Sequence, residues 1–455
     1  MILLMNLFKK YRWILLLIIL SAILRGFIYF QVMNITPFAD YFDYKQWIYR
    51  NYSLGFHNLY VINPTTRAAN INQPPGTIYI LRGSFEVFLQ TARVLTHFMH
   101  LTPGATLWVN DSLLIFFVRL PSILADLILG FAIYVMVKTK TSEKLALAAA
   151  AIYLLSPPLI YNSTVWGQMD SINNLFFYLS LMFLIKKRAL PSVLFFALSL
   201  FTKLSLLPLI PLYLLLALFG GFFKRKAFAI SVAVTGLIIL LLNLPFSTNP
   251  FWLLEFVIKA SPGESQVITV NAFNFWWLIF NPILRVSPPD IFTVVLGLTL
   301  NMWGNLIFAG FYLSVVLCFW KLIKKRKLTT DKVFLFFAIV AFITFLFLPK
   351  MHERYLYPVF PLLVTWVGFK NKYWIATILL SLIHFINLYV VWNPIFLFRS
   401  FETVIRSQAG DRFLSLATLL IFGFFYIKMF SIPKFSFKLK FTSSIKHLPM
   451  KIRRK

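Results

Sequence analysis

The stretch Thr36–Tyr44 places two carboxylates, Asp40 and Asp43, directly after an apolar run long enough to cross a membrane. Thr36 is suited to cap a helix, and Pro37 is suited to its first turn. Residues three apart on such a helix share a face, with Cβ atoms roughly 5–6 Å apart. A carboxylate held there beside a membrane wall is a candidate general base. Acids in a first helical turn also favour the helix dipole, so the residues alone leave a purely structural role equally open.

A second group of polar residues could supply positive charge. Lys203 follows one apolar segment, and the run His352–Arg354 interrupts another. Three consecutive polar side chains cannot all face lipid, so some of them must face a cavity or water. Lys203, His352 and Arg354 are therefore candidate donors to a phosphate at the membrane surface. Basic residues such as Lys350 and Arg354 are also common interface anchors beside a membrane span.

A third group is compatible with sugar binding. Trp166-Gly167-Gln168-Met169-Asp170 combines an aromatic face with hydrogen-bond donors and acceptors. The candidate contacts to a sugar or an acceptor are Trp166, Gln168, Asp170 and, from the other polar run, Glu353. A Trp in a membrane protein more often belongs to the aromatic belt at the interface, and this alternative stays open for Trp166.

Two further charges, Arg119 and Asp126, lie inside one apolar run. They are seven residues apart and therefore share a helix face. An unpaired charge at that depth costs about 2.5–3.5 kcal/mol. We therefore expect the two to be paired for a structural reason, directly or through neighbours.

The composition indicates a membrane protein. Of the residues, 60% are hydrophobic and 13% are charged, whereas about a quarter are charged in soluble domains. Apolar runs near the ~20 residues that a helix needs to cross a bilayer recur from end to end. The short alternating segments of a membrane barrel are not seen. We therefore expect an all-α membrane protein. Its one cysteine, Cys318, gives no intrachain disulfide and no multi-thiolate metal site.

The net charge of +30 is distributed in a way that argues against nucleic-acid binding. The basic residues form short clusters between apolar runs, which is the positive-inside pattern, so we expect these clusters to face the cytoplasm. The basic tail 431–455 is expected there too, either at anionic headgroups or in solvent. The clusters are Lys9–Arg12, Lys138–Lys144, Lys186–Arg188, Lys224–Lys226, Lys321–Lys332, Lys370–Lys372 and the tail.

Each interval between cytoplasmic clusters must cross the membrane an even number of times. About twelve transmembrane helices are therefore predicted in one domain, 1–430, with both termini inside and two large loops, 33–111 and 247–302, outside. In the first loop, apolar spacing over 81–99 predicts an amphipathic helix lying flat at the interface. Segment 291–300 is apolar but too short to cross, and we expect it at the interface. The predicted crossings are Trp13–Val32, Ser112–Val137, two each within Leu145–Ile185 and Ala189–Phe223, Ala227–Phe246, Trp303–Trp320, Val333–Leu348, Leu356–Phe369, Tyr373–Trp392 and Phe413–Ile427.

Five short motifs, all on the predicted outer side, resemble the loops of the polytopic GT-C glycosyltransferases. The nearest likeness is to glucosyltransferases and mannosyltransferases that use dolichyl-phosphate sugars, and to their bacterial relatives. The resemblance covers most of the chain, from about residue 10 to about residue 390. The motifs are Phe38-Ala39-Asp40-Tyr41 with Lys45-Gln46-Trp47, Asn72-Gln73-Pro74-Pro75, Trp166–Asp170 with Asn173-Asn174, Phe201-Thr202-Lys203, and Met351–Tyr355.

The resemblance implies a GT-C-type fold and an inverting transfer of mannose or glucose from a polyprenyl-phosphate-linked donor. The acceptor would be a glycan, glycolipid or protein on the extracytoplasmic side, and no metal or other cofactor would be needed. Asp40 matches the family Asp that activates the acceptor hydroxyl. Gln73 stands where the family pattern has Tyr, and Asp43 is an additional acid. A Trp-Trp-Asp motif is missing, which argues against en bloc transfer of a glycan to protein.

Two other functions stay open at this point. A lipid-linked sugar flippase or secondary transporter would carry essential polar groups along a path at mid-membrane. A lipid-linked glycan polymerase or ligase would use a diphosphate donor instead of a monophosphate. The membrane is expected to be the plasma (inner) membrane, with the endoplasmic reticulum membrane as the alternative.

Overall fold

The structure is a computed structural model, and it describes residues 2–33, 35, 39–57, 59–60, 71–100, 103–260, 266–280, 287–394 and 399–431. Thr36 and Pro37, with their predicted capping role, and nearly all of the basic tail 431–455 lie outside these residues. The elements are α1 (Ile2–Val32), α2 (Ala39–Leu54), α3 (Pro75–Met99), α4 (Pro103–Lys138), α5 (Glu143–Leu154), α6 (Pro157–Ile160), the π-helix η2 (Tyr161–Trp166), α7 (Asp170–Ile185), α8 (Ala189–Thr202), the 3-10 helix η3 (Leu204–Leu209), α9 (Ile210–Phe219), α10 (Arg225–Asn243), α11 (Trp252–Ala260), β1 (Thr269–Val270), α12 (Phe275–Phe280), β2 (Val294–Val295), β3 (Leu298–Thr299), α13 (Leu300–Lys324), α14 (Thr330–Phe347), β4 (Met351–His352), the 3-10 helix η4 (Glu353–Leu356), α15 (Val359–Lys370), α16 (Trp374–Val391), α17 (Arg399–Ile405) and α18 (Gln408–Ser431).

The chain is an all-α membrane protein by the length and apolarity of its helices. Among the described residues, seven helices are long and apolar enough to cross a bilayer, and the bent pair α5 with α6–η2 would be an eighth. Shorter apolar helices follow at Asp170–Ile185, Ala189–Thr202 and Leu204–Phe219. The seven long segments are Lys10–Val32, Asp111–Lys138, Arg225–Asn243, Leu300–Lys324, Thr330–Phe347, Trp374–Val391 and Gln408–Phe430.

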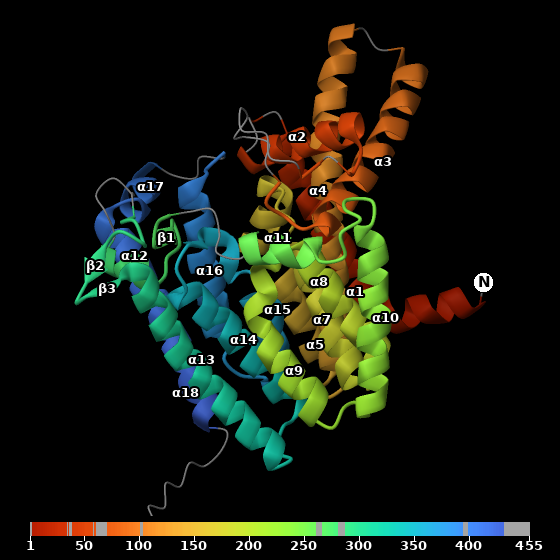
Figure 1. The fold of residues 1–455 in the computed structure, drawn as a ribbon. Coiled ribbons are helices and arrows are strands. Elements are labelled where there is room, and N and C mark those ends of the chain that lie inside the picture. The colour runs from red at the N-terminus through yellow and green to blue at the C-terminus, as the bar shows by residue number, and fades with distance from the viewer. Residues whose placement is uncertain are drawn as a thin grey trace, which may run out of the picture.

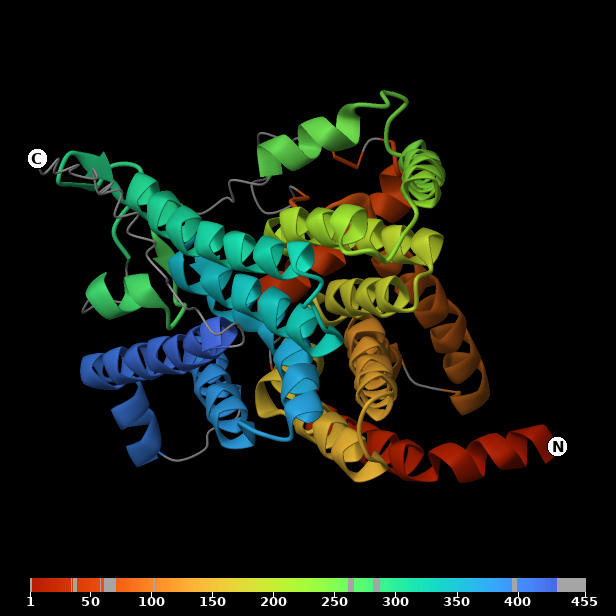
Figure 2. The same cartoon turned by 90° about the horizontal axis from the view of Figure 1, so that it is seen from below.

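The helices pack as one bundle whose middle is α4, α7, α14 and α15 (Figures 1 and 2). Every residue of α14 from Val333 to Phe347 is buried, as expected for a helix that is apolar on all sides. By contrast, α1 and α10 are buried over only 22% of their apolar windows and present most of their surface outward. The bundle therefore has an inner layer shielded by protein and outer helices available to lipid.

A group of buried polar contacts joins α1 to α4 inside this bundle. Asp126 pairs with Arg25 of α1 at 3.5 Å and also accepts hydrogen bonds from the hydroxyls of Tyr153 and Tyr357. Arg25 additionally donates to the carbonyl of Leu154. Asp126 is thus engaged for a structural reason, as expected, but its ion-pair partner is Arg25 of α1, and no direct pair with Arg119 is found among the described residues.

Proline breaks the span that begins with α5. The helix ends at Leu154, Pro157 and Pro158 start the short helix α6, and the two halves are bent by 49°. Proline lacks the N–H that would continue the helical ladder, which explains the break. The chain then winds into the π-helix η2 and leaves it at Gly167 with φ of 80°. This irregular path delivers Gln168 and Asp170 to the start of α7.

The first large loop supplies α2 and α3, which lie at one end of the bundle (Figure 1). The predicted amphipathic helix is confirmed as α3, with Leu81, Phe85 and Phe88 on its buried face. It does not lie flat, however. It runs beside the first part of α4 and projects with it beyond the bundle (Figure 1). Its apolar face is thus buried against protein, mainly α4, α2 and α8.

The beginning of α3 docks on the end of α8. The hydroxyl of Thr77 donates to the carbonyl of Thr202 at 2.6 Å. At Gly76, an added Cβ would lie 2.5 Å from the carbonyl oxygen of Phe201. Only glycine permits this approach, and it fixes the backbone immediately before Lys203.

The second large loop folds back onto the segment that follows α14. Strand β1 pairs in parallel with β4, so Thr269 faces Met351 and Val270 faces His352. Asn274 and Trp276 donate to the carbonyls of Phe345 and Phe347, which satisfies groups that the helix end leaves unpaired. The loop therefore acts as the support for the His352–Arg354 run.

Segment 291–300 contains a two-stranded hairpin rather than an irregular interfacial stretch. β2 and β3 pair antiparallel, and Leu296 and Gly297 form its tip with positive φ values. Leu296 is 88% exposed, and Phe292 and Val294 are exposed too. An exposed apolar hairpin of this kind fits the expected place at the interface.

Candidate functional site

Four segments far apart in the chain meet around Asp40. The carboxylate of Asp40 accepts a short hydrogen bond from the side-chain amide of Gln168. The guanidinium of Arg354 lies 3.9 Å from the same carboxylate. Asp40 remains 26% exposed, whereas Gln168 is buried. The carboxylate is thus held by one hydrogen bond and one longer ion pair while part of it stays exposed.

Lys203 enters the same region through a buried ion pair. Its ammonium lies 2.7 Å from Asp170, and their side chains are only 8% and 3% exposed. The ring of Tyr355 covers both cations, with its centroid 5.7 Å from the Lys203 ammonium and 5.7 Å from the Arg354 guanidinium. The two cations therefore lie against the same aromatic ring.

The run His352–Arg354 contributes three different chemical groups. Glu353 is buried and pairs with the adjacent Arg354 at 3.0 Å, and burial raises the pKa of the Glu353 carboxyl. Burial, together with the nearby charges of Arg354 and Lys203, lowers the pKa of His352 well below 6.5. His352 is therefore neutral near pH 7 and can act as a hydrogen-bond donor rather than as a third cation.

The charges of this cluster nearly balance. The acids are Asp40, Asp170 and Glu353, and the permanent cations are Lys203 and Arg354. Each cation is already engaged by a carboxylate within 4 Å. An anion that binds here must therefore exchange with a carboxylate, most simply at the long contact between Arg354 and Asp40.

Several supporting residues were not singled out from the sequence. Tyr44 donates to the Gln168 side-chain oxygen at 3.4 Å, and Asn162 donates to Asp170 at 3.5 Å. Tyr44 lies one helical turn after Asp40, so its place on the same face of α2 could have been found from spacing. Tyr355 could not, since its ring faces the cations only through the turn of η4.

Two of the expected site residues lie apart from these contacts. Trp166 is buried against the rings of Tyr161 and Trp392, so in this conformation it packs between helices. Asp43 is partly buried on α2 and lies three residues beyond Asp40. Gln168 and Arg354 both contact Asp40.

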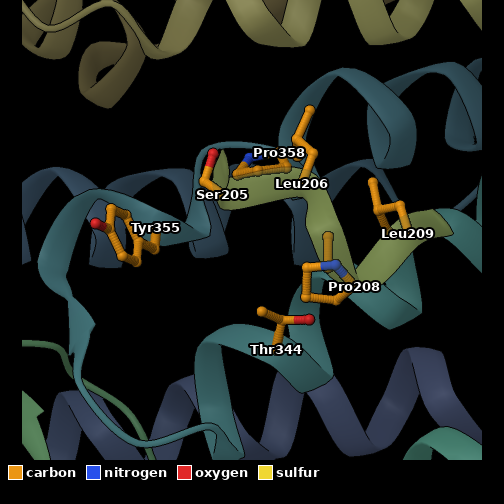
Figure 3. A pocket seen from close by; sticks show the side chains of 8 residues that line it. Ser205, Leu206, Pro208, Leu209, Thr344, Tyr355 and Pro358 are labelled. Carbon is orange, nitrogen blue, oxygen red and sulfur yellow. The ribbon is translucent and has the colours of Figure 1, made fainter. Parts of the chain in front are cut away.

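A small cavity lies next to the cluster, behind Tyr355 (Figure 3). It has about 10 Å³ of space for water, enough for roughly one molecule. Its lining comes from η3, the end of α14, η4 and the residues just before α15. This cavity is too small for a hexose or a lipid phosphate. The lining residues are Ser205, Leu206, Pro208, Leu209, Ala341, Thr344, Tyr355 and Pro358.

Comparison with known proteins adds no assignment to this geometry. The chain matches no family model, and no curated protein is significantly similar to it.

Proposed function

We propose that this chain is a GT-C-type membrane glycosyltransferase with about twelve crossings and cytoplasmic termini, in the plasma (inner) membrane. It transfers mannose or glucose from a polyprenyl-phosphate-linked donor to an acceptor on the extracytoplasmic side. The observation that carries the proposal is the meeting of Asp40 with Gln168 and Arg354, beside the buried pair of Lys203 and Asp170. These groups come from the motifs that resemble the family.

Asp40 is the general base of the proposed reaction. Its carboxylate takes the proton of an acceptor hydroxyl while that oxygen bonds to the anomeric carbon of the donor. The bond between the anomeric carbon and the phosphate oxygen breaks at the same time, and the lipid phosphate leaves with the electron pair. Attack from the opposite side inverts the anomeric configuration. General base catalysis of this kind contributes about 10²–10⁴ in rate.

The donor phosphate is assigned to Lys203, His352 and Arg354. Negative charge grows on the leaving phosphate, and donors already in place stabilise it without reorganisation. Arg354 would exchange its 3.9 Å contact with Asp40 for the phosphate. That exchange frees the Asp40 carboxylate at the moment when a donor is present. Gln168, Asp170 and Glu353 would contact sugar hydroxyls, with Trp166 contributing only if η2 moves.

Transport is the weaker alternative. A flippase needs polar groups along a path through the bilayer, and the deep charges Arg25 and Asp126 are instead engaged with each other and with tyrosine hydroxyls. A polymerase or ligase would share the same base but take a diphosphate donor, so donor chemistry separates it from the proposal.

The test is turnover by the purified, full-length protein in lipid nanodiscs, with Asp40→Asn compared with Asp43→Asn as the matched control. Radiolabelled mannose and glucose are supplied on polyprenyl monophosphate and, separately, on polyprenyl diphosphate. We expect Asp40→Asn to lose about 10²–10⁴ of the rate with the monophosphate donor and Asp43→Asn to keep most of it. Near-normal turnover by Asp40→Asn refutes the assignment of the base, and a preference for the diphosphate donor favours the polymerase or ligase.

A further inference from the structure

Arg119 carries a buried charge that the site described above does not use. It lies in α4 and is 1% exposed, and its Nη1 atom has no hydrogen-bond partner. No ion pair joins it to a carboxylate of the described chain. The ring of Tyr29 lies 5.7 Å from the guanidinium. A buried cation without an anion is unfavourable, so its surroundings suit an anion from outside the chain.

The Arg119 side chain lies next to the turn at Gly167 and Gln168, which contacts Asp40. An added Cβ at Gly167 would lie 2.9 Å from Cγ of Arg119, so the glycine with positive φ makes room for the arginine stem. The next residue, Gln168, donates to Asp40. Arg119 therefore reaches the turn that carries Gln168 from α4, with Tyr29 of α1 over its guanidinium.

A second hydrogen-bonding group without a partner lies near Arg119. The hydroxyl of Tyr41, the neighbour of Asp40 on α2, is buried and has no partner among the described residues. Apart from burial, the carboxylate of Asp111 acts most strongly on this hydroxyl, and the charge of Arg119 acts on it more weakly. A guanidinium N–H can only donate and a phenol can donate, so the pair selects an acceptor-rich anion. Phosphate suits arginine best because two parallel hydrogen bonds can form.

The surface beside this pair is suited to a lipid chain. Phe27 and Phe30 lie one turn apart on the outer part of α1 and are 62% and 68% exposed. Tyr29, which covers Arg119, lies between them in sequence and contacts the ring of Phe30. An isoprenoid or acyl chain could therefore lie along α1 while its phosphate reaches Arg119.

We propose that Arg119 and Tyr41 bind the phosphate of a lipid at a second site, contributed by α4 and α2. The assignment of this lipid as the acceptor rests on the proposed function, because the donor phosphate then occupies the Lys203–Arg354 side. The phosphate site itself is independent of that function. It adds a second phosphate site whose residues adjoin Asp40 in sequence, at Tyr41, and adjoin the Gln168 turn in space, at Arg119.

The experiment counts bound lipid phosphates on the full-length protein by native mass spectrometry from detergent, with farnesyl phosphate as the probe. Farnesol and inorganic phosphate are the control probes. The variants are Arg119→Gln, Arg119→Lys, Tyr41→Phe and, for the other side, Arg354→Gln. Wild type should bind two farnesyl phosphates. Arg119→Gln should lose one of them, with affinity at that site roughly tenfold to a hundredfold weaker, while Arg119→Lys and Tyr41→Phe should weaken it less.

Thermal unfolding without lipid separates binding from folding. If Arg119 serves a ligand, Arg119→Gln should melt at or above the wild-type temperature and lose the stabilisation that farnesyl phosphate gives. The proposal is overturned if Arg119→Gln and Arg119→Lys each bind two farnesyl phosphates with wild-type affinity. It is also overturned if farnesol or inorganic phosphate binds as tightly as farnesyl phosphate. If Arg354→Gln retains both molecules while Arg119→Gln loses one, the second site stands and the assigned donor-phosphate site fails.

Discussion

The ammonium of Lys203 lies 2.7 Å from the carboxylate of Asp170, and both side chains are almost completely buried. The pair sits where α8 ends and α7 begins, so one ion pair ties two helices together at the edge of the site. Each charge offsets the free-energy cost of burying the other. Their roles in stability and in chemistry can be separated by removing one partner or both.

We expect Lys203→Met to reduce the free energy of unfolding by about 3–5 kcal/mol, because it leaves Asp170 buried without its partner. The double variant Lys203→Met with Asp170→Asn should recover much of that stability but not turnover. Lys45→Met is the control, since its pair with Asp111 is exposed and contributes little. Melting curves in detergent measure the effect. Equal losses in the single and double variants would contradict the pairing.

Gly76 and Gly83 lie in the same helix and form a matched pair. Gly76→Ala would push a methyl group against the carbonyl of Phe201, whereas nothing lies within 4 Å of a Cβ at Gly83. We expect Gly76→Ala to destabilise by about 1–3 kcal/mol and Gly83→Ala to stabilise by roughly 0.5–1 kcal/mol. Melting temperature and donor turnover report both effects. Equal behaviour of the two variants would show that α3 does not dock on α8 as described.

The pKa of His352 is lowered on folding, so folding releases a proton where the unfolded chain holds one. The effect of His352 on the free energy of unfolding is therefore most favourable above pH 6.5, the ordinary pKa of histidine. That free energy decreases as the pH falls below 6.5. Glu353, whose pKa is raised, contributes in the opposite direction. When the pH is lowered from about 7.5 to about 5.5, we expect the melting temperature of His352→Gln to fall less than that of the wild type.

The same pH series with Glu353→Gln serves as the control for this prediction. That variant should lose more stability on acidification than wild type, because it lacks the carboxyl that takes up a proton on folding. A His352→Gln curve parallel to wild type would mean that folding does not lower the pKa of the imidazole.

The predicted orientation can be tested because the chain has one cysteine, the buried Cys318. In a Cys318→Ser background, a cysteine at Asp111 should react with an impermeant maleimide from outside intact cells. A cysteine at Lys224 should react only after the membrane is opened, since basic clusters face the cytoplasm. Labelling of Lys224→Cys in intact cells, with Asp111→Cys protected, would invert the topology.

Much of the architecture follows from sequence because apolar runs and basic clusters report directly on membrane crossings. Both large loops were predicted to lie on the same side of the membrane, and the first of them supplies α2 and α3 at one end of the bundle (Figure 1). The sequence predicted Asp40 and Arg354 on the same outer side of the membrane, and the structure adds their direct contact. Spacing alone would not have joined residues that lie in separate helices.

The features that the sequence did not predict depend on which of several neighbouring side chains makes a given contact. Arg119 and Asp126 share a helix face, yet Arg25 from α1 reaches the carboxylate first. Trp166 belongs to a polar motif, but the π-helix η2 turns its ring toward Tyr161 and Trp392. Such choices are set by the packing of neighbouring helices, which a one-dimensional pattern does not contain.

The parallel pairing of β1 with β4 has a consequence for biosynthesis. A ribosome must translate beyond His352 before this ladder can close, whereas Asp40 leaves the translocon among the first residues. During most of membrane insertion, the nascent chain therefore exposes its carboxylate without the guanidinium that later faces it. Newly made molecules therefore complete the contact between Asp40 and Arg354 as one of the last steps of assembly, and chains that end before η4 lack it.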